Sequence, residues 1–266
     1  MDADLERRFG GLRRLYGDAG YTRLRALRAA VVGLGGVGSW TAEALARSGV
    51  AGLVLIDLDH VAESNVNRQV QALGSTLGMG KGQALRERID DIHPGCDVVV
   101  VEEFVEPGNW PALLPGPIDA LVDACDQVRA KVALAAWAAA TGVVFVGVGA
   151  AGGKRLPQRV EVDDLASVTH DPLLASVRQR LRREHGAARG APLGLRCVYS
   201  REPVHRPVGC EVGAGLACHG YGSSVMVTAA FGLAAAAEVV EQVLRRAMIV
   251  GSADRVVSSV GRAADF

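Results

Sequence analysis

The chain is poor in lysine. Only Lys81, Lys131 and Lys154 carry ammonium groups among 266 residues, and arginine supplies the rest of the positive charge. The formal net charge is zero, so composition does not indicate a protein that binds polyanions over its whole surface. Because lysines are so few, each one deserves a structural or functional explanation.

Paired cysteines are also missing. The five cysteines are widely scattered and form no C-x-x-C pair, which argues against a structural zinc site of the usual spacing. Their odd number argues against a disulfide framework and favours a reducing compartment. The first ten residues, MDADLERRFG, are charged and lack an apolar core, so we expect no secretory signal. These features predict a cytoplasmic protein.

One stretch raises the question of membrane insertion. Residues Gly220–Ala237 carry no charge, and this length approaches that of a spanning helix. The run is rich in Gly, Ser and Ala and poor in Leu and Ile, which favours a helix buried in the protein or in an interface. We therefore expect no stable membrane insertion.

Short apolar runs alternate with helical segments up to Gly153. The apolar runs are typical of parallel strands buried on both faces, and we expect strands at Ala29–Val32, Gly52–Asp59, Cys96–Phe104, Ile118–Asp126 and Val143–Gly153. Helices are expected at Leu5–Arg28, Ser39–Ser48, Gly80–Ile92 and Gln127–Gly142. This alternation predicts an α/β, Rossmann-like fold with a mainly parallel sheet and helices on both faces.

The pattern changes after Gly153. We expect a strand leaving the sheet within residues 154–166, a basic helix over Asp171–Gly186, a short strand over Arg196–Glu202, a glycine-rich loop from His205 to Cys218, and a hydrophobic helix from about Ser223 to Met248. The chain is expected to form one domain, 1–266. Its parts are a helical arm (1–28), a nucleotide-binding core (29–153) and an extension for substrate binding and dimerisation (154–266).

A glycine-rich turn follows the first expected strand. Its glycines let the backbone approach a ligand, and a helix N-terminus behind them favours an anion; they are Gly33, Gly35, Gly36 and Gly38. Asp57, at the end of the second expected strand, is placed to accept hydrogen bonds from a ribose. These features fit NAD and ATP equally.

Residues further along favour ATP. A triphosphate needs fixed cations where pyrophosphate leaves, and Arg68 and Lys81 are suited to that role, with Asn65 on the same loop as Arg68. Asp126 follows the fourth expected strand at the carboxyl edge of the sheet, where it is placed to hold Mg²⁺ against the phosphates. Each residue alone also has a structural interpretation, as a cap or a surface side chain.

The order of these motifs resembles the superfamily of ubiquitin-activating-type (ThiF/MoeB-like) adenylating enzymes. The resemblance rests on G-x-G-G-x-G, the acid Asp57, the stretch NVNRQ (Asn65–Gln69), Lys81 and Asp126. A narrower resemblance, to the bacterial tRNA threonylcarbamoyladenosine dehydratase family, rests on RFGG with RLYG (Arg8–Gly17), GVGSW, SNVNRQ, DPL before the basic helix, CVYS (Cys197–Ser200) and CHGYGSSVMVTAAFG (Cys218–Gly232).

This resemblance implies an ATP-dependent reaction on a modified adenosine beside the tRNA anticodon. The threonyl carboxylate is adenylated and then attacked by a nitrogen of the same side chain, so that water is lost and a ring closes. The implied cofactors are ATP and Mg²⁺, with a monovalent cation left open. The implied partners are the modified tRNA, a second copy of the chain and a sulfur-relay protein, either a cysteine desulfurase or its acceptor.

Several residues keep alternative interpretations. In the resembling superfamily an N-terminal arginine reaches the partner's ATP, and Arg14 is our candidate with Arg8 as the alternative. Cys125 is interpreted as a small buried residue, and Cys218 as structural or as a thiol with a role in the reaction. For tRNA contact the candidates, each alternatively a solvated surface residue, are Arg178, Arg180, Arg182, Arg183, Lys154, Arg155 and Arg159.

Two other functions remain open from the sequence. An adenylating activator of a ubiquitin-like sulfur carrier fits the glycine loop and the cations, but such activators usually carry two C-x-x-C pairs that this chain lacks. An NAD-binding oxidoreductase fits the fold but gives no role to Arg68 and Lys81.

Overall fold

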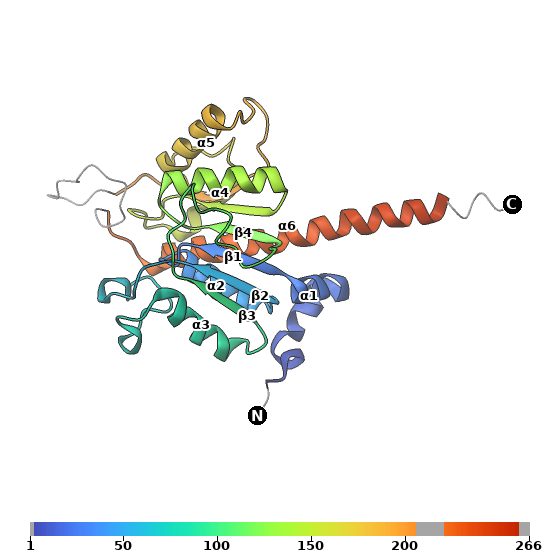
Figure 1. The fold of residues 1–266 in the computed structure, drawn as a ribbon, viewed down its shortest axis with the longest axis horizontal. Helices are drawn as coiled ribbons and strands as arrows, with labels where there is room; N and C mark the ends of the chain where they lie inside the picture. Colours follow the sequence, from blue (N-terminus) through green and yellow to red (C-terminus); the bar gives the residue numbers. More distant parts are fainter. Residues whose placement is uncertain (1–2, 206–220, 261–266) are drawn as a thin grey trace.

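A computed structural model of the chain describes residues 3–205 and 221–260. Its centre is a seven-stranded sheet in the order β3-β2-β1-β4-β5-β7-β6 (Figure 1). The strands are β1 (Arg28–Val32), β2 (Gly52–Ile56), β3 (Asp97–Val101), β4 (Ala120–Asp123), β5 (Val144–Val148), β6 (Val160–Asp164) and β7 (Arg196–Ser200). All neighbouring strands are parallel except β6 and β7, which are antiparallel. The predicted α/β fold with a mainly parallel sheet is confirmed.

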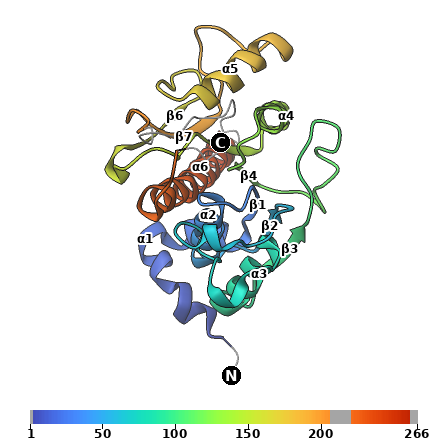
Figure 2. The same cartoon turned by 90° about the vertical axis from the view of Figure 1, so that its left-hand side faces the viewer.

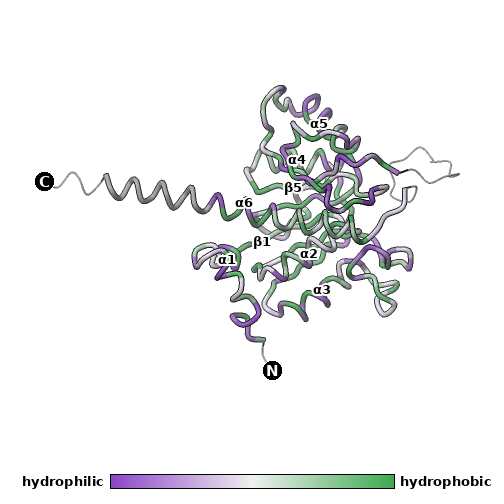
Figure 3. The backbone as a smooth tube through the Cα atoms, turned by 180° about the vertical axis from the view of Figure 1, so that it is seen from behind, coloured by the Kyte–Doolittle hydropathy of each residue, from purple (hydrophilic) through white to green (hydrophobic). Residues whose placement is uncertain are grey.

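Helices cover both faces of this sheet (Figure 2). They are α1 (Leu5–Ala26), α2 (Gly38–Arg47), α3 (Lys81–Ile92), α4 (Val128–Thr141), α5 (Pro172–Glu184) and α6 (Val225–Val260). Alternate residues of β1 point to opposite faces: Ala29 and Val31 join a core with α1, α2, α3 and α6, whereas Ala30 and Val32 join a core with α4 and α5. Figure 3 shows apolar residues concentrated on the central strands and polar ones on the outer helices.

The ends of several strands differ from the prediction in a way that matters for the site. β2 ends at Ile56 rather than Asp59, and β4 ends at Asp123 rather than Asp126. The acids Asp57 and Asp126 therefore lie just beyond their strands, on the edge where ligands bind in such sheets. β3 and β5 likewise end earlier than expected, at Val101 and Val148, so the residues that follow each of these strands lie on loops at the carboxyl edge of the sheet.

The extension after Gly153 also differs from the prediction. β6 does not leave the sheet; it forms the edge strand by pairing with β7 through residues Val160–Asp164. α6 continues to Val260, beyond the expected end near Met248, and Figure 1 shows it projecting past the body of the protein. Of the glycine-rich loop expected at His205–Cys218, only His205 is among the described residues, and Cys218 lies outside them. The division into arm, core and extension stays a prediction.

The apolar run in α6 packs inside the protein. The part Val225–Arg246 is long and apolar enough to cross a membrane by composition, yet 56% of its most apolar window is buried within the fold. Phe231, Ala235 and Val239 are fully buried in the core that also contains β1 and α2. Burial against the sheet accounts for the apolar sequence of this helix.

The buried side chain of His93 contacts two residues of α1. The His93 ring is fully buried, its Nε2 lies 2.9 Å from the Arg25 guanidinium, and the Phe9 ring packs edge-on at 4.7 Å. Burial, and secondarily the positive charge of Arg25, lower the pKa of His93. The folded chain therefore keeps this ring neutral at a pH where the unfolded chain protonates it.

This pKa shift predicts a pH-dependent stability. As the pH falls below about 6.5, the usual value for an exposed histidine, the unfolded state binds a proton that the folded state does not, so the free energy of unfolding falls. Denaturant unfolding between pH 7 and pH 5 should show a steeper loss for the wild type than for His93→Gln, which keeps a hydrogen-bonding side chain but does not titrate. Equal pH slopes would contradict the assignment.

Candidate active site

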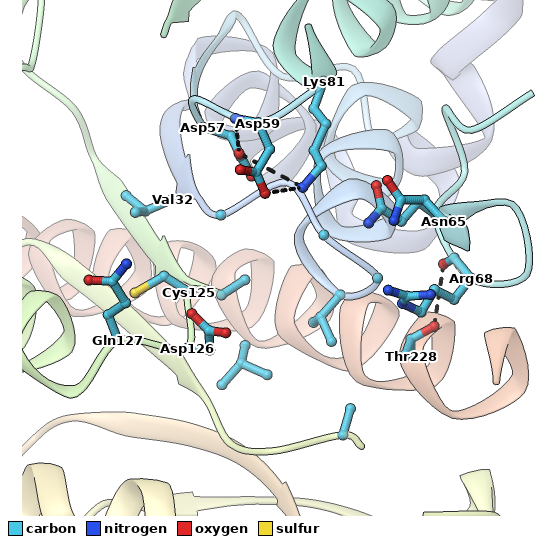
Figure 4. Close-up of a pocket in the computed structure, with 18 of the residues that line it drawn as sticks. Val32, Asp57, Asp59, Asn65, Arg68, Lys81, Cys125, Asp126, Gln127 and Thr228 are labelled. Atoms are coloured by element: carbon cyan, nitrogen blue, oxygen red, sulfur yellow. Dashed lines mark hydrogen bonds and ion pairs between the residues drawn. The ribbon is translucent and has the colours of Figure 1, made fainter. Parts of the chain in front are cut away.

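A cavity of about 390 Å³ opens at the carboxyl ends of β1, β2, β4 and β5. It lies where the strand order reverses, between β1 and β4, which is the usual ligand position in a doubly wound sheet. Its walls come from the glycine loop after β1, the segment 56–69 with Lys81, residues 124–127 after β4, and residues 148–152 after β5. Figure 4 shows this arrangement, with Arg68 and Lys81 on one side and Asp126 on the other.

The glycine loop has its sequence for steric reasons. Gly33 has a φ of +84°, and a Cβ atom there would lie 2.8 Å from the backbone nitrogen of Cys125. A Cβ atom on Gly38 would lie 1.8 Å from the carbonyl oxygen of Gly33, so the first turn of α2 packs directly against the loop. Gly35 and Gly36 line the cavity, whereas Gly38 does not. The loop thus presents backbone and the N-terminus of α2 to the cavity.

Asp57 holds the glycine loop in place. Its buried carboxylate accepts hydrogen bonds from the backbone N–H of Leu34 at 2.6 Å and from that of Asp59 at 2.9 Å. The carboxylate lines the cavity, and each of its oxygens can accept a further hydrogen bond. The contact of Asp57 with a ribose stays a prediction. The structure shows an additional role, because the carboxylate joins the end of β2 to the glycine loop by a hydrogen bond.

Lys81 is buried at the wall of the cavity. Lys81 is the first residue of α3, and its side chain is only 8% exposed. Its ammonium lies 2.7 Å from the Asp59 carboxylate and 3.9 Å from the Asp57 carboxylate. The positive charge is therefore held next to the glycine loop by two acids. The sequence indicates both acids at the end of the second strand, but it gives no role for Asp59 as the partner of Lys81.

Arg68 is fixed by contacts along its length. Its guanidinium donates to the Ser64 carbonyl at 2.6 Å and to the Asn67 side chain at 2.9 Å, and its own carbonyl accepts from the Trp40 indole on α2. Asn65, which also lines the cavity, caps the short turn before Arg68 by accepting the N–H of Ala62 at 3.0 Å. These contacts within the protein hold the cation at the wall of the cavity.

Asp126 faces these cations from the loop between β4 and α4. Its side chain is exposed and lines the cavity, and within the described part of the chain it makes no hydrogen bond or ion pair. The same part contains no group of three or more His, Cys, Asp or Glu residues able to hold a metal ion. A magnesium ion at Asp126 would therefore take its other ligands from phosphates and water, as is usual for this ion.

A buried ion pair lies beneath the Asp126 loop and was not found from the sequence. Lys131, fully buried on α4, places its ammonium 2.9 Å from the carboxylate of Asp123, the last residue of β4. Burial is the largest single effect and lowers the pKa of Lys131, but the charge and hydrogen bond of the Asp123 carboxylate, with smaller contributions from Cys125 and Cys197, together raise it. Burial raises the pKa of the Cys125 thiol. The side chain is nevertheless only half-buried and lines the cavity, so Cys125 is less buried than the sequence suggests.

The two N-terminal arginines lie away from this cavity. α1 precedes β1 and so lies at the amino ends of the strands, opposite the glycine loop. Arg14 is exposed, whereas Arg8 donates to the carbonyls of Asp91 and Ile92 at the end of α3. Of the two candidates, Arg14 is the one without a partner within the described residues, but it reaches no site in its own chain.

The predicted tRNA-contacting residues divide into two groups. Arg178 donates to the carbonyls of Leu165 and Val168, and the buried Lys154 donates to those of Ser200 and Glu202. These two cations therefore stabilise the fold. Arg180 lines a second hollow, and Arg183 pairs with Glu184 on the exposed side of α5.

The doubly wound sheet, the glycine loop at its switch point and the adjacent cations define a nucleotide-binding protein of the α/β class. A family model described as the ThiF family matches residues 8–257, and the chain belongs to this family. It is 37% identical over 247 residues to the tRNA threonylcarbamoyladenosine dehydratase of Haemophilus influenzae, covering 91% of this chain and 95% of that protein. The Escherichia coli protein of the same name is 38% identical, with 90% and 94% covered.

Solved structures agree with the sequence relatives. The crystal structure of E. coli tRNA N6-threonylcarbamoyladenosine dehydratase, TcdA, in complex with ATP matches with a TM-score of 0.84 at 37% identity, covering 93% of this chain and 98% of that one. The AMP complex of the same protein also matches with a TM-score of 0.84, at 38% identity, covering 92% and 98%. The resemblance expected from the motifs is confirmed.

The buried Lys131–Asp123 pair gives a testable prediction. Lys131→Met leaves a buried carboxylate without its cation and should lower the free energy of unfolding by about 3–5 kcal/mol. The double variant Asp123→Leu with Lys131→Met removes both charges and should be less destabilised than the single variant in the same denaturant titration. A cost below about 1 kcal/mol for Lys131→Met, the range of exposed pairs, would contradict the buried pairing.

Proposed function

We propose that this chain catalyses the ATP-dependent dehydration of threonylcarbamoyladenosine beside the anticodon of tRNA, through adenylation of the threonyl carboxylate. The observation that carries this proposal is the convergence of Arg68, Lys81 and Asp126 on the cavity formed by the glycine loop. Relatives that cover nine-tenths of the chain bear the name of this activity, and one of them binds ATP and AMP.

In the first step an oxygen of the threonyl carboxylate attacks the α-phosphorus of ATP, and the bond to the bridging oxygen of pyrophosphate breaks. Negative charge grows on the leaving pyrophosphate, and the guanidinium of Arg68 and the ammonium of Lys81 neutralise it. Backbone N–H groups of the glycine loop hold the phosphates, and Asp57 accepts from the ribose. Lys81 exchanges part of its pairing with Asp59 for the phosphate.

In the second step a nitrogen of the same side chain attacks the activated carbonyl carbon. The acyl–phosphate bond breaks, AMP leaves and the nitrogen loses its proton. The modified adenosine thus loses one water in total, while ATP becomes AMP and pyrophosphate. Ring closure is intramolecular, so positioning the side chain supplies up to about 7–11 kcal/mol of the barrier reduction.

Magnesium fits this site at Asp126. The carboxylate is exposed to the cavity and free of partners among the described residues, and a carboxylate oxygen is a suitable ligand for this ion. When bound, Mg²⁺ neutralises and orients the triphosphate. In this chain Asp126 would hold the ion through a carboxylate oxygen.

A homodimer completes the proposed site. Arg14 is exposed on α1 at the amino ends of the strands, so its guanidinium can serve only the ATP of a partner subunit. We further propose a cytoplasmic location, where tRNA is modified, and a sulfur-relay protein as an additional partner. Cys218, the candidate thiol for such a relay, lies outside the described residues.

The rival adenylating function has less support. The molybdopterin-synthase adenylyltransferase of Haemophilus influenzae is 30% identical over 112 residues, which is 42% of this chain. The chain also lacks the two C-x-x-C pairs that activators of sulfur carriers usually carry, which argues against that function.

The choice of substrate is tested by pyrophosphate release. With ATP and tRNA that carries threonylcarbamoyladenosine, the protein should release pyrophosphate and AMP, because adenylation precedes ring closure. With ATP and a carrier protein ending in Gly-Gly it should release none above background. Release that depends on the carrier alone would replace the proposed function by carrier activation, and tight NADH binding without ATP turnover would indicate an oxidoreductase.

The phosphate assignment is tested by removing the cations. Arg68→Ala and Lys81→Ala should each lower the rate of pyrophosphate release by about 10²–10³-fold, the usual cost of one transition-state donor. Circular dichroism should show a native fold for both. Arg86→Ala, which removes an exposed arginine on α3 outside the cavity, is the matched control and should keep the wild-type rate. Near-normal release by both cavity variants would contradict the assignment.

A further inference from the structure

A second hollow, of about 450 Å³, lies between α4, α5 and the segment that carries Pro107 and Trp110. Two indoles form much of its wall: the rings of Trp110 and Trp137 meet edge to face, with centroids 5.2 Å apart and planes at 84°. None of the residues assigned to ATP lines it. A hollow of this size is in the range of small-ligand pockets, and aromatic walls are suited to flat rings.

The rim of this hollow is cationic. Arg129, Arg180 and His185 lie around it together with one acid, Glu184. That acid pairs with Arg183 at 2.5 Å, whereas Arg129 and Arg180 make no ion pair within the described part of the chain. Two guanidinium groups are thus available to an anion from outside the protein. Indoles beneath unpaired arginines are the combination that binds single-stranded nucleic acid, by stacking on the base and contacting the phosphate.

One buried donor at the wall of the hollow is unsatisfied within the described residues. The indole N–H of Trp110 is buried and has no hydrogen-bond partner among the described residues. Such a group costs free energy unless an acceptor is supplied.

The hollow and the catalytic cavity are neighbours in the fold. Val105 lines the cavity and Pro107 lines the hollow, and two residues of chain span at most about 7 Å. On α4, Ala130 faces the cavity and Arg129 faces the hollow. Two sites separated by so little chain can hold two nucleotides of one strand.

We propose that this hollow binds an unstacked nucleotide of the anticodon loop, next to the modified adenosine whose side chain enters the catalytic cavity. The inference rests on the proposed function, because it assumes an RNA substrate. Trp110 and Trp137 contact the base, and Arg129 and Arg180 contact its phosphates. The anticodon loop is thereby opened, and the threonyl carboxylate is presented to ATP.

The test measures binding of an anticodon stem-loop that carries threonylcarbamoyladenosine to the full-length protein. The double variant Arg129→Gln with Arg180→Gln should weaken binding at least tenfold and reduce the slope of log Kd against log salt by about 1 to 2. Trp137→Leu should weaken binding by about 5- to 150-fold, the effect of one lost stack. The dissociation constant for ATP should not change in either variant. Arg86→Gln, which changes an exposed arginine on α3 outside both the cavity and the hollow, is the matched control.

A second readout locates the nucleotide directly. With 4-thiouridine in the anticodon loop beside the modified adenosine, irradiation should crosslink the RNA to peptides containing Trp110 or Trp137. Wild-type affinity in the double variant, equal weakening by Arg86→Gln, or crosslinks only outside the hollow would overturn the inference. So would a loss confined to binding of a protein partner. Normal stem-loop binding that depends on both arginines, without pyrophosphate release by the wild type, would instead contradict the proposed reaction and leave this site standing.

Discussion

The active site depends on the buried carboxylate of Asp57. This group accepts the N–H of Leu34 and that of Asp59, so it fixes the glycine loop against the end of β2. Asp59 in turn pairs with Lys81, which brings an ammonium group beside the loop. A loop able to hold phosphates and a cation able to neutralise them are therefore positioned by one short segment of chain. Binding a triphosphate requires both, because the helix N-terminus alone supplies only part of a charge.

Much of this arrangement could be predicted from the sequence. Near-continuous apolar runs separated by helices indicate a parallel sheet, and all five strands expected before Gly153 are present. Residues at the carboxyl ends of parallel strands meet at one edge, which is why Gly33, Asp57 and Asp126 line one cavity although they are distant in sequence. The charge of ATP and the motif order predict Arg68 and Lys81 as phosphate-binding cations; both line the cavity, and their contact with phosphates stays a prediction.

Other features depend on contacts that no local pattern reveals. The pairing of Lys131 with Asp123 joins a helix to a strand end, and no local pattern in the sequence indicates it. The basic helix α5 was considered as one surface, yet Arg178 binds two backbone carbonyls while Arg180 lines a hollow. Which arginines of a charged helix remain available is decided by tertiary packing, as is the meeting of Trp110 with Trp137.

The claim that the cavity is a cationic site for phosphates is tested most directly by a crystal structure of this protein with bound ATP. It predicts that the Arg68 guanidinium and the Lys81 ammonium lie within hydrogen-bonding distance of the β- or γ-phosphate oxygens, with the phosphates against the glycine loop. ATP bound in the cavity with both groups turned to solvent, or bound elsewhere on the protein, would contradict it.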